Sequence, residues 1–377
     1  MSELIQIEIE KDKLLHNLRT FRKLAGKRTI LAPCLKGNAY GHGLIPIAKL
    51  FAKSYANWLC VNSIQEAVLL RKAGITTPIL VVGYVQNEDL EKVLIYDVRI
   101  FLYDIEIARS LSRLGKKHKK QAVVHIKIDT GMSRQGIQMD EIETFIAKLS
   151  SLSGLRLEGI ATHFATAFNG KNDPFFYTQR NNFEKLKQQL QIMLPTSRLI
   201  FHASNSAAVL VDRKSVYDLI RPGISLFGFY SSDLIEKICK DRKIDLRPAL
   251  KLKTKVSQIK TVPRGSCISY GCTYITKKQT RLAVIPIGYA DGLERRFSNN
   301  GDVLIFGKRA PIRGKICMTM LTADITHLPN VNLEDEVVII GKQKDEEITL
   351  QELSDKSGSS KGELLTGLKE SIKRVYI

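Results

Sequence analysis

The sequence predicts an α/β protein in which a (β/α)8 TIM barrel is followed by a mainly antiparallel β domain. Its 377 residues suit two or three domains of about 150 residues each. Eight short apolar runs alternate with helical patterns in the first 230 residues, which predicts parallel strands covered by helices. After Arg247 the pattern changes to a period of two. We therefore predict a barrel over residues 1–245 and a β domain over residues 246–377.

The predicted barrel strands are rich in β-branched residues. They cover residues 30–35, 58–62, 78–83, 98–102, 123–128, 155–162, 199–202 and 219–224. Helical periodicity separates them, as in residues 12–24, where Leu14, Leu18 and Phe21 repeat every three or four positions. Eight such units favour a closed barrel with its functional residues at the carboxyl ends of the strands.

The second part begins with strict alternation. Leu250, Leu252 and Thr254 alternate with lysines, which predicts a strand with one solvated face. Further strands are predicted at residues 281–287, 303–306, 315–325 and 336–340. Thr349 followed by Glu352 is a capping-box pattern that opens a final helix.

Composition excludes several classes of protein. Hydrophobic residues make up 44% and charged residues 25%, as in ordinary globular domains, and no apolar run is long enough to span a membrane. The start lacks a signal-peptide pattern, and the six cysteines lack a CxxC pair, so we expect a cytoplasmic protein without disulfides.

The charge balance suggests one alternative function. Lysine and arginine number 58 against 38 acidic residues, a net charge of +20, which would suit a nucleic-acid partner. The basic residues are spread along the chain, however, and we interpret the dense run at residues 116–120 as a solvated loop. Strong salt-dependent binding to random DNA would favour the alternative.

Polar residues gather at the predicted carboxyl ends of the strands. Lys36 follows the first strand, and a lysine amine there can form a Schiff base with a carbonyl. Further polar clusters begin at His125, His163, His202 and Arg221. Ser206 and the backbone amides of Gly223 and Ile224 can donate to a phosphate. A lysine, an arginine and phosphate donors together predict pyridoxal phosphate (PLP) as cofactor, with no metal.

Seven motifs in order along the chain resemble those of the alanine racemase family. They are KGNAYGHG at 36–43, HIKIDTGMSRQG at 125–136, THFATA at 162–167, HASNSAA at 202–208, RPGISLFG at 221–228, SYG at 269–271 and GYADG at 288–292. The resemblance implies a PLP-dependent isomerase that interconverts L- and D-alanine, as a homodimer with shared active sites. It also implies a supply of D-alanine for peptidoglycan.

The resemblance assigns the two proton-transfer groups. Lys36 would hold PLP and act as one base, and Tyr270 of the second subunit would act as the other. Racemisation removes the α-proton from one face of a planar carbanion and returns a proton on the opposite face, so two flanking groups suit the chemistry. His163 is implied to link to Tyr270 and Arg221.

The remaining roles concern binding. By resemblance, Arg221 faces the pyridine nitrogen, and because arginine does not readily lose its proton, that nitrogen stays unprotonated. The phosphate would be held by Tyr40, Ser206, Gly223 and Ile224. Arg134 would approach the ring hydroxyl and the substrate carboxylate, and the Met318 amide the carboxylate. Lys127 aligns with a lysine that the family often carbamylates.

Three positions depart from the family pattern. Phe168 stands where Asp is usual, Thr319 follows Met318 in place of Asp, and Gly362 replaces a tyrosine. By resemblance these positions border the substrate entrance, so a broader serine/alanine racemase is the alternative function. Two further rivals are a basic amino-acid decarboxylase, whose glycine-rich phosphate loop is absent, and a single-barrel PLP carrier, for which the second domain would be superfluous.

Overall fold

The computed structural model describes residues 4–195 and 197–377. The chain forms two compact units, which are described separately. The barrel unit comprises residues 12–39 and 44–247, and the second unit comprises residues 1–11, 40–43 and 248–377. The first eleven residues thus pack with the C-terminal part of the chain, whereas a cut at residue 245 would leave them with the barrel.

The barrel unit contains the parallel strands that the apolar runs predicted. They are β2 (Ile30–Leu31), β3 (Leu59–Val61), β4 (Ile79–Val81), β5 (Arg99–Leu102), β6 (Ala122–Lys127), β7 (Leu155–Ala161), β8 (Ile200–His202) and β9 (Leu219–Ile220). Strands β3 to β8 follow one another in a single sheet, and β2 pairs with β9. Every pairing among these strands is parallel.

Backbone contacts beyond the strand ends close the ring. A parallel bridge joins Cys34 to Cys60, next to a 2.8 Å hydrogen bond from Leu35 N to Cys60 O. The segment that follows β2 therefore lies beside β3. On the other side, Arg221 N donates to Ser204 O at 2.9 Å, which links β8 to β9. The predicted (β/α)8 barrel is confirmed.

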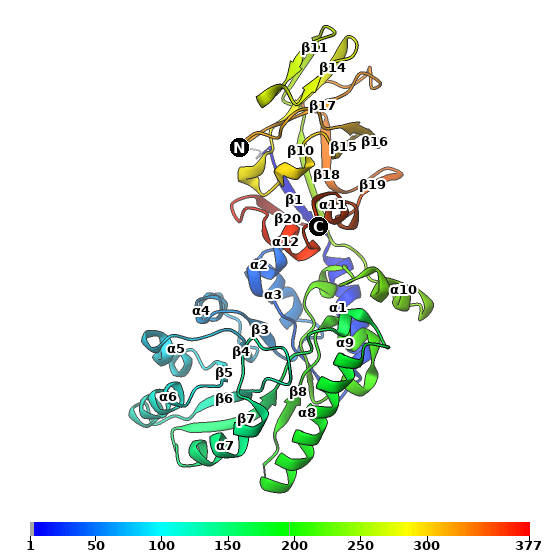
Figure 1. The fold of residues 1–377 in the computed structure, drawn as a ribbon. Coiled ribbons are helices and arrows are strands. Elements are labelled where there is room, and N and C mark those ends of the chain that lie inside the picture. The colour runs from blue at the N-terminus through cyan, green and yellow to red at the C-terminus, as the bar shows by residue number, and fades with distance from the viewer. Residues whose placement is uncertain (1–3, 196) are drawn as a thin grey trace. The chain divides into compact units, whose positions relative to one another are not determined.

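Helices surround the strands of this unit (Figure 1). They are α1 (Lys11–Ala25), α2 (Lys36–Tyr40), α3 (Leu44–Ala52), α4 (Ile64–Lys72), α5 (Leu90–Ile95), α6 (Ile105–Lys117), α7 (Ile142–Ser150), α8 (Pro174–Met193), α9 (Ser206–Val211) and α10 (Asp233–Asp241). Short 3-10 turns lie at η1 (Asn87–Asp89), η2 (Met139–Glu141), η3 (Ala167–Asn169), η4 (Arg213–Ser215) and η5 (Ile224–Phe227).

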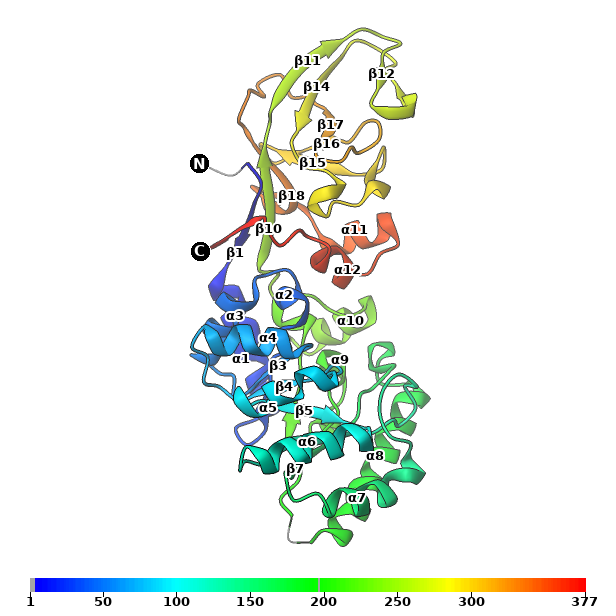
Figure 2. The same cartoon turned by 90° about the vertical axis from the view of Figure 1, so that its left-hand side faces the viewer.

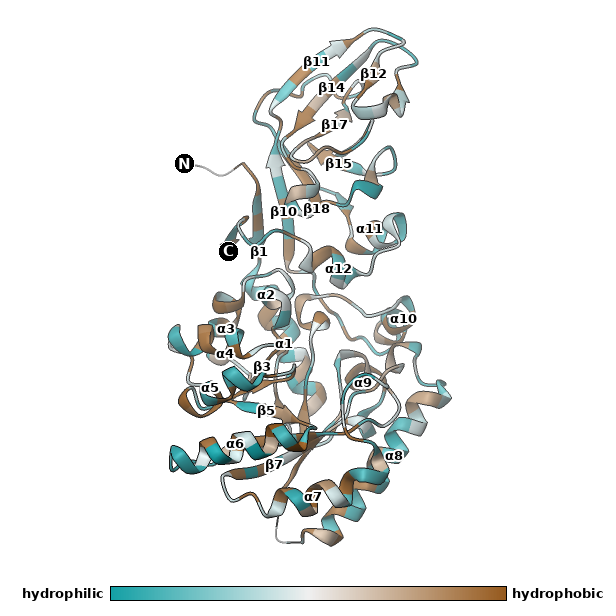
Figure 3. Cartoon of the chain, turned by 60° about the vertical axis from the view of Figure 1, so that its left-hand side comes forward, coloured by the Kyte–Doolittle hydropathy of each residue, from teal (hydrophilic) through white to brown (hydrophobic). Residues whose placement is uncertain are grey.

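Several of these helices are amphipathic, as their periodicity predicted, whereas α9 is buried along its whole length. Helix α1 buries Leu14, Leu18 and Phe21. Figure 3 shows hydrophilic and hydrophobic residues alternating along α6 and α8. None of the helices in the described residues has the length and apolar character needed to cross a membrane.

The second unit is built mainly from antiparallel strands (Figure 2). They are β1 (Gln6–Ile9), β10 (Leu250–Lys255), β11 (Gln258–Val262), β12 (Cys267–Ile268), β13 (Tyr274–Ile275), β14 (Thr280–Ile285), β15 (Asp302–Ile305), β16 (Lys308–Pro311), β17 (Leu321–Asp324), β18 (Glu336–Gln343), β19 (Glu346–Ile348) and β20 (Lys373–Tyr376). Its helices are α11 (Leu350–Ser357) and α12 (Lys361–Thr366), with 3-10 turns η6 (Tyr270–Cys272), η7 (Tyr289–Asp291) and η8 (Arg295–Phe297).

Two strands of this unit come from the ends of the chain. Strand β1 pairs antiparallel with β10 and parallel with β20, and these join a sheet ordered β16-β15-β18-β10-β1-β20. Neither β1 nor β20 was predicted. Their partners lie far away in the sequence, and four-residue strands show too little periodicity to be recognised alone. Strand β10 alternates buried and half-buried residues, as predicted.

The strand expected at residues 315–325 is only partly correct. Strand β17 covers Leu321–Asp324, and the preceding residues form a loop. In that loop Cys317 N donates to Met320 O at 2.9 Å, and Cys317 O accepts from Tyr289 N at 3.1 Å. These bonds satisfy the backbone of the loop without strand pairing.

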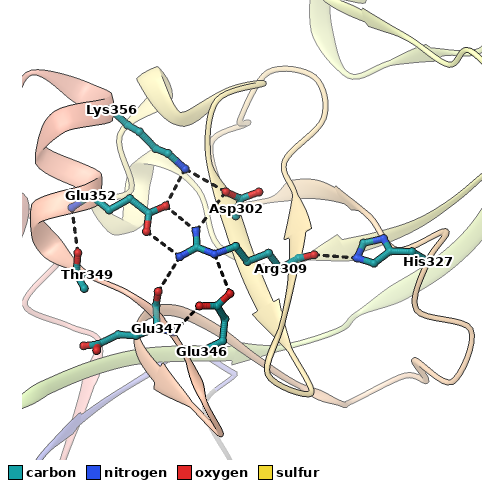
Figure 4. Close-up of polar contacts among 8 residues, drawn as sticks. All are labelled: Asp302, Arg309, His327, Glu346, Glu347, Thr349, Glu352 and Lys356. Atoms are coloured by element: carbon teal, nitrogen blue, oxygen red, sulfur yellow. Dashed lines mark hydrogen bonds and ion pairs between the residues drawn. The ribbon is translucent and has the colours of Figure 1, made fainter.

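An ion network supports the second unit (Figure 4). Arg309 donates to both carboxylate oxygens of Glu352, at 2.7 and 2.9 Å, and to Glu346 at 3.2 Å. Lys356 bridges Glu352 and Asp302 at 2.8 and 3.0 Å. Thr349 accepts from the Glu352 amide at 3.1 Å and caps α11, as predicted. We call Asp302, Arg309, Glu346, Glu352 and Lys356 the Arg309 network.

The expectation of no disulfide is wrong. Cys267 and Cys272 are bonded, with a Cα–Cα distance of 4.9 Å. Cys267 begins β12 and Cys272 ends the turn η6 inside the β12–β13 hairpin, and the distance between them is within the range that a disulfide requires. Cys34, Cys60 and Cys239 are buried free thiols, and Cys317 is free and half-buried.

Candidate active site

A cavity of about 490 Å³ lies in the barrel unit, within the size range of small-molecule sites. Four predicted site residues line it: Lys36, Arg134, His163 and Arg221. Lys36 follows β2, His163 follows β7 and Arg221 follows β9, so the cavity lies at the carboxyl ends of the strands, where barrel sites form. Lys127 and Cys34 also line it.

The backbone after Lys36 has a rare conformation. Gly37, Asn38, Ala39 and Tyr40 all have positive φ, between 51° and 63°. Only glycine adopts that region at little cost, so three consecutive non-glycine residues there require support from their surroundings. Asn38 provides some of it, because its Oδ1 accepts from Leu44 N at 2.7 Å. Lys36 itself is exposed at the start of this turn.

Arg221 is held by several acceptors. Its Nη2 donates to Thr162 O at 2.7 Å and to Ala203 O at 3.2 Å, and its Nη1 contacts His202 Nδ1. Burial lowers the pKa of Arg221, but a guanidinium keeps its proton in proteins, so the side chain is a buried cation. Only 6% of the residue is exposed.

A chain of hydrogen bonds continues from Arg221 through the barrel. His202 Nε2 lies 2.8 Å from His125 Nδ1, and His125 Nε2 lies 3.1 Å from Glu158 Oε2. Glu158 also accepts from Arg99 Nε at 2.6 Å. We call Arg221, His202, His125 and Glu158 the histidine relay. Near its end, the Arg99 guanidinium lies 4.5 Å from the ring centre of Trp58.

The charges of the histidine relay determine which atom donates and which accepts in each of its hydrogen bonds. Burial lowers the pKa of both His125 and His202, so both rings are neutral near pH 7. Burial alone would raise the pKa of Glu158, but hydrogen bonds from His125 and Arg99 outweigh it and lower that pKa to about 2. His125 must therefore donate from Nε2 to the carboxylate and accept at Nδ1. His202 then donates from Nε2 and accepts at Nδ1 from Arg221.

The cavity is strongly cationic. Burial and the charge of Arg221 lower the pKa of Lys127 to about 7, and only 4% of the residue is exposed. Burial, followed by the charges of Arg221 and Lys127, holds the pKa of His163 well below its usual value. Such a site suits an anionic ligand, because an anion compensates charges that burial makes costly.

The predicted phosphate donors lie at the last two strands. Ser206 begins α9, and its Oγ accepts from Gly223 N at 2.8 Å; Ile224 then begins η5. Because Gly223 N already donates to Ser206 Oγ, the Ser206 hydroxyl keeps its own proton as a donor suited to a phosphate. Together with the Lys36 amine and the cationic cavity, this hydroxyl fits a phosphorylated aldehyde such as PLP. The described residues contain no group of three His, Cys, Asp or Glu side chains suited to a metal ion.

Tyr40, Tyr270 and Met318 belong to the second unit. Tyr270 is 69% exposed and Met318 57% exposed. Hydrogen bonds join their segments: Ser269 Oγ donates to Lys315 O at 2.6 Å, and Met318 O accepts from Ala290 N at 2.9 Å. Motifs SYG and GYADG and the Met318 segment thus form one cluster.

That cluster depends on a glycine. A Cβ at Gly288 would lie 2.3 Å from Cys317 O and 2.4 Å from Met318 O, so only glycine permits this approach of the two backbones.

Sequence reasoning missed part of the site. The histidine that Arg221 contacts is His202, while His163 Nε2 lies 3.4 Å from Asn205 Nδ2. Glu158 was not singled out, although a half-buried glutamate within a mostly apolar strand was an available signal. Its partner lies on the neighbouring strand β6, which pattern analysis cannot pair atom by atom.

Comparisons with known proteins agree across the whole chain. Residues 9–231 match the family model of the alanine racemase N-terminal domain, and residues 249–376 match that of the C-terminal domain. A similar relative is the alanine racemase of Methanococcus maripaludis, 39% identical with 100% of each chain covered.

Solved structures extend the likeness to the fold. Bacillus anthracis alanine racemase with bound L-Ala-P is 33% identical, with a TM-score of 0.93, and covers 100% of this chain and 96% of its own. Bartonella henselae alanine racemase with covalently bound pyridoxal phosphate is 25% identical, with a TM-score of 0.87, and each chain is covered completely. The chain therefore belongs to the alanine racemase family, PLP-dependent isomerases that interconvert L- and D-alanine.

Proposed function

We propose that this chain racemises alanine by a two-base mechanism in which Lys36 and Tyr270 carry the α-proton on opposite faces of the substrate. The observation that supports it most directly is the single cavity that brings together Lys36, Arg134, His163 and Arg221. When bound, PLP supplies an electron sink beside the substrate α-carbon. Lys36 is exposed and lines the cavity, which supports its proposed roles of holding the cofactor and of taking or returning the proton.

Arg221 would act as a permanent hydrogen-bond donor to the pyridine nitrogen. Three of its five N–H groups are occupied by Thr162 O, Ala203 O and His202 Nδ1, which leaves donors for the cavity. Because the guanidinium keeps its proton, the nitrogen facing it would stay unprotonated. A weaker electron sink follows, which favours return of the proton over transamination.

A second copy of the chain would complete the site. Tyr270, Tyr289, Met318 and Met320 are all between 44% and 69% exposed in the second unit. Exposed aromatic and methionine side chains gathered by hydrogen-bonded segments are typical of protein interfaces. We infer a homodimer in which each Tyr270 serves the cavity of the partner.

Lys127 is suited to carbamylation. Reaction with carbon dioxide requires a neutral amine, and a pKa of about 7 supplies that form near neutrality. The carbamate would add a negative charge beside Arg134 and Arg221, where the cavity is now cationic. We expect 13C-bicarbonate to produce a carbamate NMR signal that Lys127→Ala removes.

Serine is the second candidate substrate. Gly362 occupies α12 in place of a tyrosine, Phe168 is 45% exposed, and Thr319 lies in the Met318 segment. A hydrophobic pocket discriminates one methylene by only about 1–3 kcal/mol, and it rejects an added hydroxyl only weakly. We further infer a cytoplasmic enzyme that supplies D-alanine for peptidoglycan. The free thiols Cys34, Cys60, Cys239 and Cys317 support this inference, and the Cys267–Cys272 disulfide is the exception.

The test is chiral analysis of L-alanine and, in parallel, L-serine after incubation with PLP-loaded protein. We expect D-alanine to accumulate, Lys36→Ala to abolish it, and Tyr270→Phe to reduce it strongly. D-serine equal to or above D-alanine would favour the broader racemase. Full activity of Tyr270→Phe would exclude the two-base assignment.

A further inference from the structure

Two exposed cysteines enclose the tyrosine that the proposed mechanism uses. Cys267 and Cys272 are joined across the sequence CISYGC, and Tyr270 lies between them. We call residues 267–272 the Tyr270 loop. Of the other thiols, Cys34, Cys60 and Cys239 are buried, and Cys317 is half-buried. Exposed cysteine pairs are accessible to small thiols and disulfides.

The backbone of the Tyr270 loop is unusual. Ser269 has φ 61° and ψ −171°, a region that is essentially restricted to glycine. Gly271 and Cys272 also have positive φ, at 72° and 47°. A short loop with three such residues holds this conformation only when its surroundings impose it.

Hydrogen bonds impose it at the two ends of the loop. Ser269 Oγ donates to Lys315 O at 2.6 Å. On the other side, Asn299 Nδ2 donates to Thr273 Oγ1 at 3.1 Å. Tyr270, Gly271 and Cys272 lie between these anchors, and the disulfide adds a covalent link from Cys272 back to Cys267.

We propose that Cys267 and Cys272 are a reversible thiol–disulfide modification site, and that the disulfide positions Tyr270 for proton transfer. The inference rests on the proposed role of Tyr270. With the disulfide closed, the tyrosine stands on a restrained turn; after reduction, only the flanking hydrogen bonds restrain it. Cys267 and Cys272 are positioning residues, because they act through Tyr270.

The chemistry is thiol–disulfide exchange with a small disulfide. The thiolate of one cysteine attacks the small disulfide, which breaks its S–S bond, forms a mixed disulfide and releases one small thiolate. The second cysteine thiolate then attacks the protein sulfur of that mixed disulfide and releases the second small thiolate. The two protein thiols lose two electrons and two protons, and the small disulfide becomes two thiols.

A lysine lies beside the loop. A Cβ on Gly271 would lie 3.3 Å from Lys315 Nζ, so an ammonium group is adjacent to the loop. A nearby cation stabilises the thiolate, which is the reacting form. Cys267 and Cys272 are both exposed, so a small thiol or disulfide can reach them next to this cation.

The experiment equilibrates PLP-loaded enzyme in buffers of reduced and oxidised glutathione. Alkylation and peptide mass mapping give the state of each cysteine, and hydrogen exchange of peptides covering residues 267–276 gives the order of the loop. Racemisation assays give kcat and KM. On reduction we expect several-fold faster exchange at residues 270–272 and a several-fold lower kcat, with KM nearly unchanged.

Variants separate the possible causes. The double variant Cys267→Ser, Cys272→Ser should show the fast loop exchange and the low kcat of the reduced enzyme in every buffer. Cys317→Ser is the matched control, because Cys317 Sγ lies 3.4 Å from Ser269 Oγ and is the free thiol beside this loop. That variant should keep the redox response.

Three results would overturn the proposal. Cys267 and Cys272 could remain fully alkylatable in oxidised buffer, or Cys317 could replace one of them in the mapped disulfide. Alternatively, reduction could change exchange in the loop without changing kcat while Tyr270→Phe is inactive. An active Tyr270→Phe variant would instead refute the proposed function, and mapping and exchange would still report on the disulfide.

Discussion

The two units each contain a polar network, and the two networks compensate their charged side chains in different ways. In the barrel unit, the histidine relay places one buried cation, Arg221, and one carboxylate, Glu158, at opposite ends of two neutral imidazoles. In the second unit, the Arg309 network alternates cations and carboxylates in direct contact, with side chains 22–41% exposed (Figure 4).

The difference follows from solvent. Deep in the barrel, an unpaired charge is costly, so each proton of the histidine relay must have a defined acceptor. In the Arg309 network, water and salt screen the charges, and several partners share each one. The first network is therefore directional and sensitive to a single substitution, while the second tolerates rearrangement.

Glu158→Leu should have the largest effect. It removes the acceptor of His125 and leaves Arg99 without its carboxylate, which we expect to lower the free energy of unfolding by about 3–5 kcal/mol. Denaturant unfolding followed by fluorescence of Trp58, the single tryptophan, measures the barrel unit. Glu158→Gln should cost less, because its amide oxygen can still accept from His125. If the leucine variant and the wild type had equal free energies of unfolding, Glu158 would not stabilise the barrel through the histidine relay.

Acidification should destabilise the barrel unit first. The pKa values of His125 and His202 are lowered by burial, so their contribution is complete above about pH 6.5 and is lost as the pH falls below it. Glu158, with a pKa of about 2, adds a loss of about 3 kcal/mol between about pH 4.5 and 2. The pKa of Glu352 in the second unit is also lowered, mainly by its bond from Arg309, so its contribution is lost only below about pH 4.5.

Trp58 fluorescence and hydrogen exchange of peptides covering residues 302–309 should separate the two transitions. The order would be wrong if the second unit lost protection at a higher pH than the barrel unit.

Arg309→Met should have an intermediate effect. It leaves Glu346 and Glu352 without their shared cation, although Lys356 still contacts Glu352. We expect a loss of about 2 kcal/mol at low salt, and less at high salt because ions screen exposed charges. Thermal unfolding across a salt series measures this. A loss that does not depend on salt would show that the network acts by packing.

Arg156→Gln should have the smallest effect. Arg156 Nη2 contacts the same Glu158 carboxylate at 3.0 Å, but its side chain is 49% exposed. Exposed ion pairs contribute at most about 1 kcal/mol. The same unfolding assay should therefore separate this variant clearly from Glu158→Leu. A loss as large as that of Glu158→Leu would mean that solvent exposure does not explain the contrast.

Local patterns predicted much of the fold. The eight apolar runs became the barrel strands, alternation after Arg247 became β10, and Thr349 caps α11. These features depend on which face of an element is buried, and that is encoded in residues a few positions apart. The motif resemblance likewise gathered Lys36, Arg134, His163 and Arg221, which line one cavity.

The sequence by itself thus determined the fold class, the family and the chemistry-bearing residue types. Only the tertiary structure decided the pairing of β1 with β10 and β20, the contact of Arg221 with His202, and the disulfide around Tyr270. Strand partners, tautomers and sulfur pairs are chosen by atoms that meet across long stretches of chain or across a tight turn. Periodicity carries information about faces, and it carries none about which atoms meet.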